Sequence, residues 1–165
     1  TVSDAGFLLN NEMDDFSAKP GSPNGYGLIG GIANEIQPGK RPLSAMTPTI
    51  VFDGKGDPIL ATGSPGGSTI ITAVLQVLLN VLEFDMGIAD ATAASRVHHQ
   101  WLPDRMGYEP GISPDTLHLL TQMGHSLEQE ARILGSTQSI HKGVNGATMG
   151  ASDTRRDGAG AVPQR

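Results

Sequence analysis

The longest regular pattern of hydrophobic residues covers positions 69–82. Its apolar residues recur at i, i+3, i+4 and i+7 and nearly surround the axis, as in a buried helix. The short apolar run at 58–62 predicts a strand, and a glycine-rich turn at 63–68 joins it to the helix. We expect Ser68 to cap this helix, because its hydroxyl accepts a free N–H of the first turn. The sequence therefore predicts a strand–turn–helix unit at the centre of the fold.

Shorter patterns predict the other elements. Strands are expected at residues 6–11 (buried), 49–52, 126–131, 136–141 and 147–152, and a helix at 87–94. A further helix starts with Ser113 as N-cap and Pro114 at its first position, and Gly124 ends it. Because strands and helices both segregate and alternate, the pattern predicts a layered α+β sheet fold.

Residues 49–52 and 58–62 are expected to form a hairpin. Residues 17–40 are rich in Gly, Pro, Asn and Ser, and an irregular segment of that length is more often functional than idle. The sequence predicts one domain over residues 1–156 and a small, polar, flexible tail at 157–165.

Composition removes several classes of function. The formal net charge of −6 argues against a general nucleic-acid binder, which needs a basic face. Cysteine is absent from the 165 residues, so neither a disulfide framework nor a thiol nucleophile is available. The sequence also has no pattern typical of a signal peptide or a membrane span.

The glycine-rich turn is a candidate anion site. Gly66 and Gly67 lack a Cβ, so their amides can approach a bound atom, and a helix N-terminus favours a phosphate, a carboxylate or a developing oxyanion. No Gly-Lys-Ser/Thr follows, so the turn is not a phosphate P-loop. Thr62 replaces the first glycine of a nucleophile elbow. Taken alone, the pattern equally fits a tight turn with no ligand.

Other polar residues have two interpretations each. The acidic cluster of Glu12, Asp14 and Asp15 is either a solvated charge cluster or a set of acceptors for an ammonium group, and no nearby histidine favours a metal. His98 and His99 point to opposite faces of an extended segment, which favours a hydrogen-bonded core or interface role.

Five motifs, in this order, resemble the small subunit of γ-glutamyltransferases, members of the N-terminal-nucleophile hydrolase group. The motifs span nearly the whole chain, at residues 8–17, 40–44, 63–68, 98–103 and 135–139. The resemblance implies a four-layer αββα sandwich. It also implies a precursor that cuts itself and so exposes a threonine at the head of the small subunit. Thr1-Val2-Ser3 does not match that head, so we expect a small subunit without its nucleophile segment.

The resemblance assigns roles to matching residues. Gly66 and Gly67 would form the oxyanion hole. Glu12 and Asp15 would hold the α-ammonium of the γ-glutamyl group. No metal site is implied.

The remaining substrate contacts are also implied by the resemblance. Ser44 would bind the α-carboxylate, and Ala45 replaces a second serine that is usual in the family. Residues 16–31 would form a lid, with Tyr26 as its gate.

The implied activity is transfer of the γ-glutamyl group of glutathione to water or to an amino-acid or peptide acceptor, through a threonine acyl-enzyme. It implies no cofactor. It implies a large subunit that supplies an arginine, and a periplasmic or extracellular location. This chain alone is expected to be inactive.

One alternative is a glutaryl-type acylase, which would not need Glu12 and Asp15, and another is a non-catalytic anion-binding module. Thr1 as a terminal nucleophile is a further, less favoured interpretation.

Overall fold

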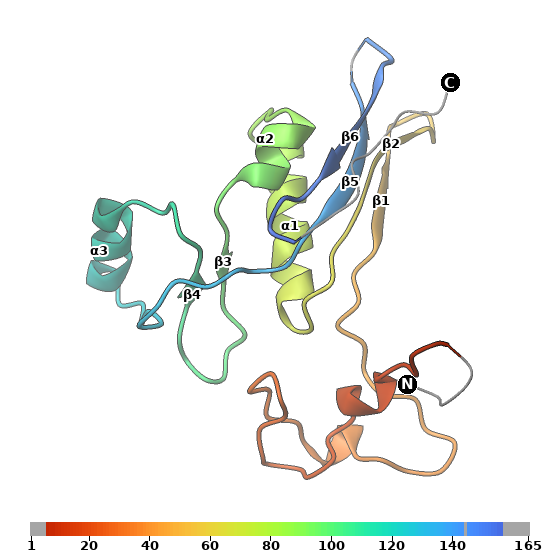
Figure 1. Cartoon of the computed structure of the whole chain (residues 1–165), viewed down its shortest axis with the longest axis vertical. Coiled ribbons are helices and arrows are strands. Elements are labelled where there is room, and N and C mark those ends of the chain that lie inside the picture. The colour runs from red at the N-terminus through yellow and green to blue at the C-terminus, as the bar shows by residue number, and fades with distance from the viewer. Residues whose placement is uncertain (1–5, 144, 157–165) are drawn as a thin grey trace. The chain divides into compact units, whose positions relative to one another are not determined.

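The computed structural model describes residues 6–143 and 145–156, and the chain divides into two compact units, residues 1–45 and 46–165 (Figure 1). Thr1 and the tail expected at residues 157–165 lie outside the described residues. The single domain expected over residues 1–156 stays a prediction.

The first unit holds two short 3-10 helices, η1 (Glu12–Asp15) and η2 (Ile32–Asn34). The buried strand expected at residues 6–11 is wrong, because that segment has no strand structure and is exposed. Leu8 and Leu9 are 75% and 71% exposed. A strand needs a neighbouring backbone to bond to, and the described residues do not supply one there.

The second unit is built on a four-stranded antiparallel sheet in the order β1-β2-β5-β6. Its strands are β1 (Thr49–Phe52), β2 (Pro58–Gly63), β5 (Gln138–Lys142) and β6 (Thr148–Ser152). The expected β1–β2 hairpin is confirmed. The strand expected at 126–131 is wrong, because Leu127 makes only an isolated bridge with Met106.

Two helices cover one face of this sheet, α1 (Thr69–Leu82) and α2 (Ile88–Ala93) (Figure 1). The core between them consists of Leu60, Val77, Val81, Ile88, Ala91 and Ala151. The unit also contains β3 (Val97–His98), β4 (Gly107–Tyr108) and α3 (Pro114–Gln122). Ser113 caps α3 as expected, since its Oγ accepts the Thr116 N–H at 3.2 Å. Among the described residues, no helix is both long and apolar enough to cross a bilayer.

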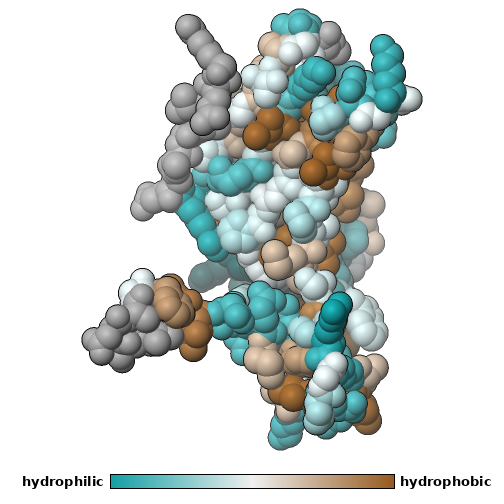
Figure 2. All heavy atoms as spheres, turned by 90° about the vertical axis from the view of Figure 1, so that its right-hand side faces the viewer, coloured by the Kyte–Doolittle hydropathy of each residue, from teal (hydrophilic) through white to brown (hydrophobic). Residues whose placement is uncertain are grey.

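Both layers of the second unit carry an exposed apolar face. On α1, Ile71 and Leu75 are 50% and 48% exposed, so the all-round burial expected for this helix is wrong within the described chain. On the open face of the sheet, Ile50 and Phe52 are 59% and 57% exposed. Figure 2 shows hydrophobic residues at the surface among hydrophilic ones. The hydrophobic pattern therefore predicts more burial than the described residues provide.

Candidate active site

The strand–turn–helix unit needs glycine at two positions. Gly66 and Gly67 have φ angles of 142° and 57°, which residues with a Cβ rarely adopt. A Cβ on Gly66 would collide with the Thr69 hydroxyl and would lie 3.4 Å from the Cα of Gly135. The backbone therefore passes through this turn at a separation that a side chain would not allow.

Ser68 does not cap α1, contrary to expectation. Its backbone is already helical, with φ −61° and ψ −25°, and its hydroxyl donates to Gln100 Oε1 at 2.8 Å. The first helical bonds run instead from Thr69 N–H to the Gly66 carbonyl and from Ile70 N–H to the Gly67 carbonyl, both at 3.2 Å. The turn thus begins at the glycines, and Ser68 lies too far into it to reach back to the free amides.

The backbone amides of Gly66 and Gly67 are candidate donors for a ligand. Among the hydrogen bonds of residues 6–143 and 145–156, neither the Gly66 N–H nor the Gly67 N–H donates to a protein acceptor. They precede a helix of 14 residues, whose N-terminal partial charge favours an anion. The geometry therefore fits a pair of donors for an oxyanion or a carboxylate.

A second segment, residues 134–137, lies against the turn. The Ser136 N–H donates to Ser64 Oγ at 2.9 Å, and Ser64 Oγ donates to the Pro65 carbonyl at 2.8 Å. A Cβ on Gly135 would come within 2.7 Å of Ser64 Oγ. The segment therefore supports the turn through a hydrogen bond and close packing.

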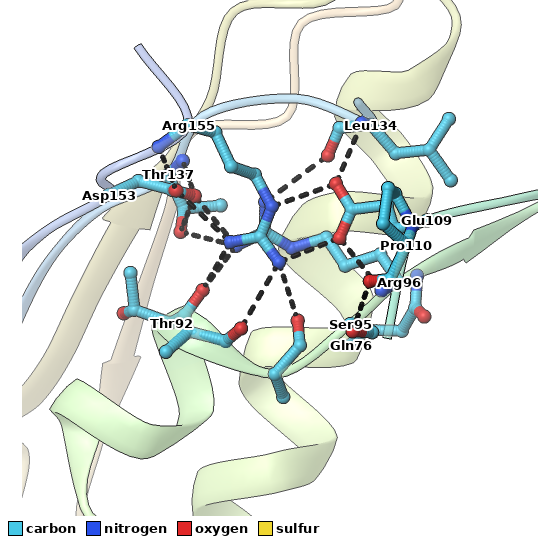
Figure 3. Close-up of polar contacts among 12 residues, drawn as sticks. Gln76, Thr92, Ser95, Arg96, Glu109, Pro110, Leu134, Thr137, Asp153 and Arg155 are labelled. Carbon is cyan, nitrogen blue, oxygen red and sulfur yellow. Dashed lines mark hydrogen bonds and ion pairs between the residues drawn. The ribbon is translucent and has the colours of Figure 1, made fainter. Parts of the chain in front are cut away.

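A buried network of charged residues fixes this supporting segment (Figure 3). Arg96 Nη2 lies 2.8 Å from Asp153 Oδ2, and Arg155 Nη2 lies 2.6 Å from Glu109 Oε2. The side chains of Arg96 and Asp153 are 2% and 0% exposed. Arg155 also contacts Asp153, with Nη1 3.0 Å from Oδ1. Two arginines and two carboxylates thus neutralise one another inside the second unit.

The network holds both ends of residues 134–137. The Leu134 N–H donates to Glu109 Oε1 at 2.8 Å, and Arg96 Nη1 donates to the Leu134 carbonyl at 3.1 Å. At the other end, the Thr137 N–H donates to Asp153 Oδ2 at 2.9 Å. The segment behind the glycine turn is therefore fixed by charge-assisted hydrogen bonds, which are about twice as strong as neutral ones.

The pKa values of two network members are shifted. Burial alone would raise the pKa of Asp153, but hydrogen bonds from Arg155, Thr137 and Arg96 outweigh it and the pKa is lowered. Burial would lower the pKa of Arg155, but hydrogen bonds to Glu109 and Asp153 raise it. Both groups are therefore held in their charged forms.

His98 lies in a separate hydrogen-bonded group beside α1. Its Nδ1 is 2.8 Å from Thr72 Oγ1, and its Nε2 is 3.0 Å from Gln100 Oε1, the same oxygen that accepts from Ser68. Burial lowers the pKa of His98, which favours the neutral ring. The hydrogen-bonded core role expected for His98 is confirmed.

The expected substrate-binding residues lie in the first unit. Glu12 and Asp15 belong to η1, and no ion pair within the described part of the chain involves either of them. Asn34 connects two parts of this unit: its Nδ2 donates to the Asp15 carbonyl at 2.7 Å, and its Oδ1 accepts the Leu43 N–H at 3.0 Å. One amide side chain thus ties the Asp15 backbone to the residue that precedes Ser44.

Tyr26 lies in the expected lid, in a turn held by Asn24. The side-chain Oδ1 of Asn24 accepts the Tyr26 N–H at 2.9 Å and the Leu28 N–H at 3.0 Å, and Tyr26 is 49% exposed. The first unit therefore carries Glu12, Asp15, Tyr26 and Ser44, and the second carries the two glycines. Their assembly into one site stays a prediction. Among the described residues, no cluster of three or more His, Asp or Glu side chains could hold a metal ion.

The family model described as gamma-glutamyltranspeptidase matches residues 1–162. The chain belongs to the gamma-glutamyltranspeptidase family. A glutathione hydrolase proenzyme of Escherichia coli (strain K12) is 57% identical over 155 residues, which are 93% of this chain and 26% of that protein. The relative of the same name in Pseudomonas aeruginosa is 47% identical, over 98% of this chain and 29% of that protein. The chain therefore spans about a quarter of the length of the curated relatives it matches.

Solved structures of the gamma-glutamyltranspeptidase family share this fold. The Pseudomonas nitroreducens structure has a TM-score of 0.88 and 45% identity, and the match covers 99% of this chain and 85% of that one. The α+β fold of the N-terminal-nucleophile hydrolase type is thus confirmed. Within the described residues, this chain supplies the four-stranded sheet with helices on one of its faces, and a two-stranded sheet of β3 and β4.

The expected site did not include the residues that surround the glycines. Ser64, Thr69 and the supporting segment 134–137 contact the turn directly, and the buried network fixes that segment. Ser64 and Thr69 flank Pro65-Gly66-Gly67-Ser68. Hydroxyl residues on both sides of a glycine turn are a local signal that could have indicated them. Arg96, Glu109, Asp153 and Arg155 are scattered single charges, and their spacing gives no comparable signal.

Proposed function

We propose that this chain is the small-subunit part of an enzyme that transfers the γ-glutamyl group of glutathione to water or an amino acid through a threonine acyl-enzyme. The match of the gamma-glutamyltranspeptidase family model to residues 1–162 carries this proposal. The curated relatives are named glutathione hydrolase proenzymes, which supports glutathione as the donor and a precursor form of the enzyme.

In this proposal the glycine turn stabilises the tetrahedral intermediate. The threonine hydroxyl attacks the γ-carbonyl, and the carbonyl oxygen becomes an anion that accepts the N–H groups of Gly66 and Gly67. Both amides stand at the N-terminus of α1 without an acceptor among the described residues. Donors already aimed at the developing charge lower the barrier without reorganising during the reaction.

The first unit would bind the amino-acid end of the donor. Glu12 and Asp15 carry charges that no cation of the described chain neutralises, so they suit the α-ammonium. Ser44 would donate to the α-carboxylate, and Tyr26 would close the lid. A glutaryl-type acylase needs no ammonium acceptors, so the two acids favour the γ-glutamyl substrate.

The proposed partner is a large subunit cut from the same precursor, which would contribute an arginine to the carboxylate site. A periplasmic or extracellular location is proposed on the family resemblance alone. The basic experiment is an assay of the mature two-subunit protein with γ-glutamyl-p-nitroanilide. Release of p-nitroaniline is expected. Its absence from a folded, processed protein would reject the proposal.

The oxyanion role is tested with Gly67→Val. The new side chain crowds the acyl carbonyl and displaces it from the helix N-terminus, and loss of one such donor costs about 10²–10³ in kcat. The measurement is kcat beside the midpoint of thermal unfolding. Because a β-branched residue is strained at the Gly67 φ of 57°, the midpoint is expected to fall as well, and a loss of kcat that stabilising mutations elsewhere do not recover supports the hole. Parallel losses that stabilising mutations elsewhere recover together would make Gly67 a turn residue only.

A further inference from the structure

The direction of each candidate donor is set by the carbonyl of the preceding residue. A trans peptide is planar, so its C=O and N–H point in opposite directions. A hydrogen bond to the Pro65 carbonyl therefore fixes the Gly66 N–H, and a hydrogen bond to the Gly66 carbonyl fixes the Gly67 N–H. In this chain a side-chain hydroxyl donates to each of these two carbonyls.

Ser64 holds the first peptide. Its Oγ donates to the Pro65 carbonyl at 2.8 Å and accepts the Ser136 N–H at 2.9 Å. A serine hydroxyl has a single proton. Because the backbone N–H of Ser136 approaches the oxygen as a donor, that proton remains directed at the Pro65 carbonyl. The supporting segment thus determines how Ser64 uses its hydroxyl.

Thr69 holds the second peptide. Its Oγ1 donates to the Gly66 carbonyl at 2.9 Å, and its N–H donates to the same oxygen at 3.2 Å. Thr69 is only 6% exposed, so water competes little for this bond. The Gly66–Gly67 peptide is therefore fixed by two donors from one residue.

The hydrogen bonds from Ser64 and Thr69 restrict peptides that are next to glycines and would otherwise rotate easily. Glycine has the widest choice of backbone conformations, and a peptide next to it can rotate at little cost. The φ angles of 142° and 57° are two of many that Gly66 and Gly67 could adopt. The described backbone supplies one bond to these carbonyls, from the Thr69 N–H to Gly66, and none to Pro65, so the two hydroxyls add the remaining restraint on the two N–H groups.

We infer that Ser64 and Thr69 are positioning residues that aim the Gly66 and Gly67 amides at the oxyanion. This inference rests on the proposed function, since it names what prepares that site. In this inference neither hydroxyl contacts the substrate. Each acts through the peptide whose carbonyl it binds. The buried network contributes indirectly, because it fixes the segment that carries Ser136.

The test uses two variants in the mature two-subunit protein, Ser64→Ala and Thr69→Val. Each substitution removes a hydroxyl group and nearly preserves the shape of the side chain. Complete loss of a donor costs about 10²–10³ in kcat, so a misaimed donor should cost roughly 10- to 100-fold, with KM within about twofold. Thr69→Ser keeps the hydroxyl and should retain most of the wild-type kcat.

Two controls remove hydroxyls that also donate to a backbone carbonyl but lie at exposed positions elsewhere. Ser95 Oγ donates to the Pro110 carbonyl at 2.9 Å, and Thr121 Oγ1 donates to the Leu117 carbonyl at 3.0 Å. Ser95→Ala and Thr121→Val should leave kcat unchanged. Crystal structures of wild type, Ser64→Ala and Thr69→Val then show whether the Pro65–Gly66 and Gly66–Gly67 peptides have rotated.

A fall in kcat that appears with peptide rotation and is absent from Thr69→Ser supports the inference. It is overturned if kcat stays within threefold of wild type, if the controls lose as much, or if kcat falls with both peptides unmoved. If the wild-type protein does not cleave γ-glutamyl-p-nitroanilide, the proposed function fails. The structures still decide the positioning roles in that case: rotated peptides support them, and unmoved peptides reject them.

Discussion

Two pairs of carboxylates in this chain have opposite surroundings. Glu109 and Asp153 have side chains that are 2% and 0% exposed, and each is paired with an arginine. Glu12 is exposed and Asp15 is half-buried, and the ion pairs of the described residues include neither. A buried charge must be paired inside the protein, whereas an accessible, unpaired one is available to a ligand. Burial and pairing therefore separate the structural acids from the candidate binding acids.

The comparison also separates what each pair should control. Removing a member of the buried network leaves an uncompensated charge in the interior, so stability should fall first. Removing an acid of η1 leaves a surface that water can solvate, so stability should hold while substrate binding changes. The predictions below test this division.

The largest effect is expected for Arg96→Met. This change leaves Asp153 without its 2.8 Å partner and removes the bonds to the Leu134 carbonyl and Thr137. Breaking a buried pair by removing one partner costs about 3–5 kcal/mol of unfolding free energy. Urea unfolding of the mature wild-type and variant proteins measures this loss of unfolding free energy.

Arg132→Met is the matched control for Arg96→Met. Arg132 pairs at 2.8 Å with Glu128, four positions away in an irregular segment, and both side chains are partly exposed, at 43% and 29%. Such an exposed pair contributes about 0.2–1 kcal/mol. Similar small losses for both variants would mean that the network is not a stabilising unit, and the comparison of the two acid pairs would fail.

An intermediate effect is expected for Asp15→Asn, measured with γ-glutamyl-p-nitroanilide and its N-acetyl derivative. A hydrogen bond to a charged group contributes about 1.5–3 kcal/mol, so kcat/KM for the free amine should fall tenfold or more. The N-acetyl substrate has no ammonium and should lose far less. The unfolding free energy should change by less than about 0.5 kcal/mol.

Asp14→Asn is the internal control, because Asp14 lies on the same 3-10 helix beside Asp15 and, unlike Glu12 and Asp15, is not assigned to the ammonium by the family resemblance. It should leave both substrates unaffected. Equal losses for the free and acetylated substrates in Asp15→Asn would instead assign Asp15 a structural role, and the difference between the two acid pairs would disappear.

Local patterns in the sequence were sufficient for much of this structure. The period of α1, the β1–β2 hairpin and the Ser113 cap of α3 depend on neighbouring residues, and all three are present. The two failed strands, at 6–11 and 126–131, depend on partners that an apolar run does not specify. Strand formation is decided by pairing as much as by composition.

The glycine turn shows the same limit within the site. Gly66 and Gly67 are visible as a motif, but the hydroxyl next to α1 was assigned to the wrong function. Ser68 lies where a cap is expected, yet it bonds to Gln100, 32 positions away, and Thr69 binds the turn instead. The buried network joins residues that are farther apart still, as in the bond from Arg155 to the Thr92 carbonyl, 63 positions away. Contacts of that range follow from the folded sheet and not from any local pattern.

The smallest effect is expected for Ala45→Ser, which sharpens the assignment of the first unit to substrate binding. The family resemblance implies a second serine at this position, and its hydroxyl would add one hydrogen bond to the α-carboxylate next to Ser44. A net gain of about 0.5–1.5 kcal/mol corresponds to a KM lower by roughly two- to tenfold. Because the carboxylate does not react, the bond forms equally in ground and transition states, and kcat should stay nearly unchanged. Steady-state kinetics with γ-glutamyl-p-nitroanilide measure both constants, and Ala45→Gly is the control without a hydroxyl. An unchanged or higher KM in Ala45→Ser would mean that other groups already make the contact that a serine at position 45 would add.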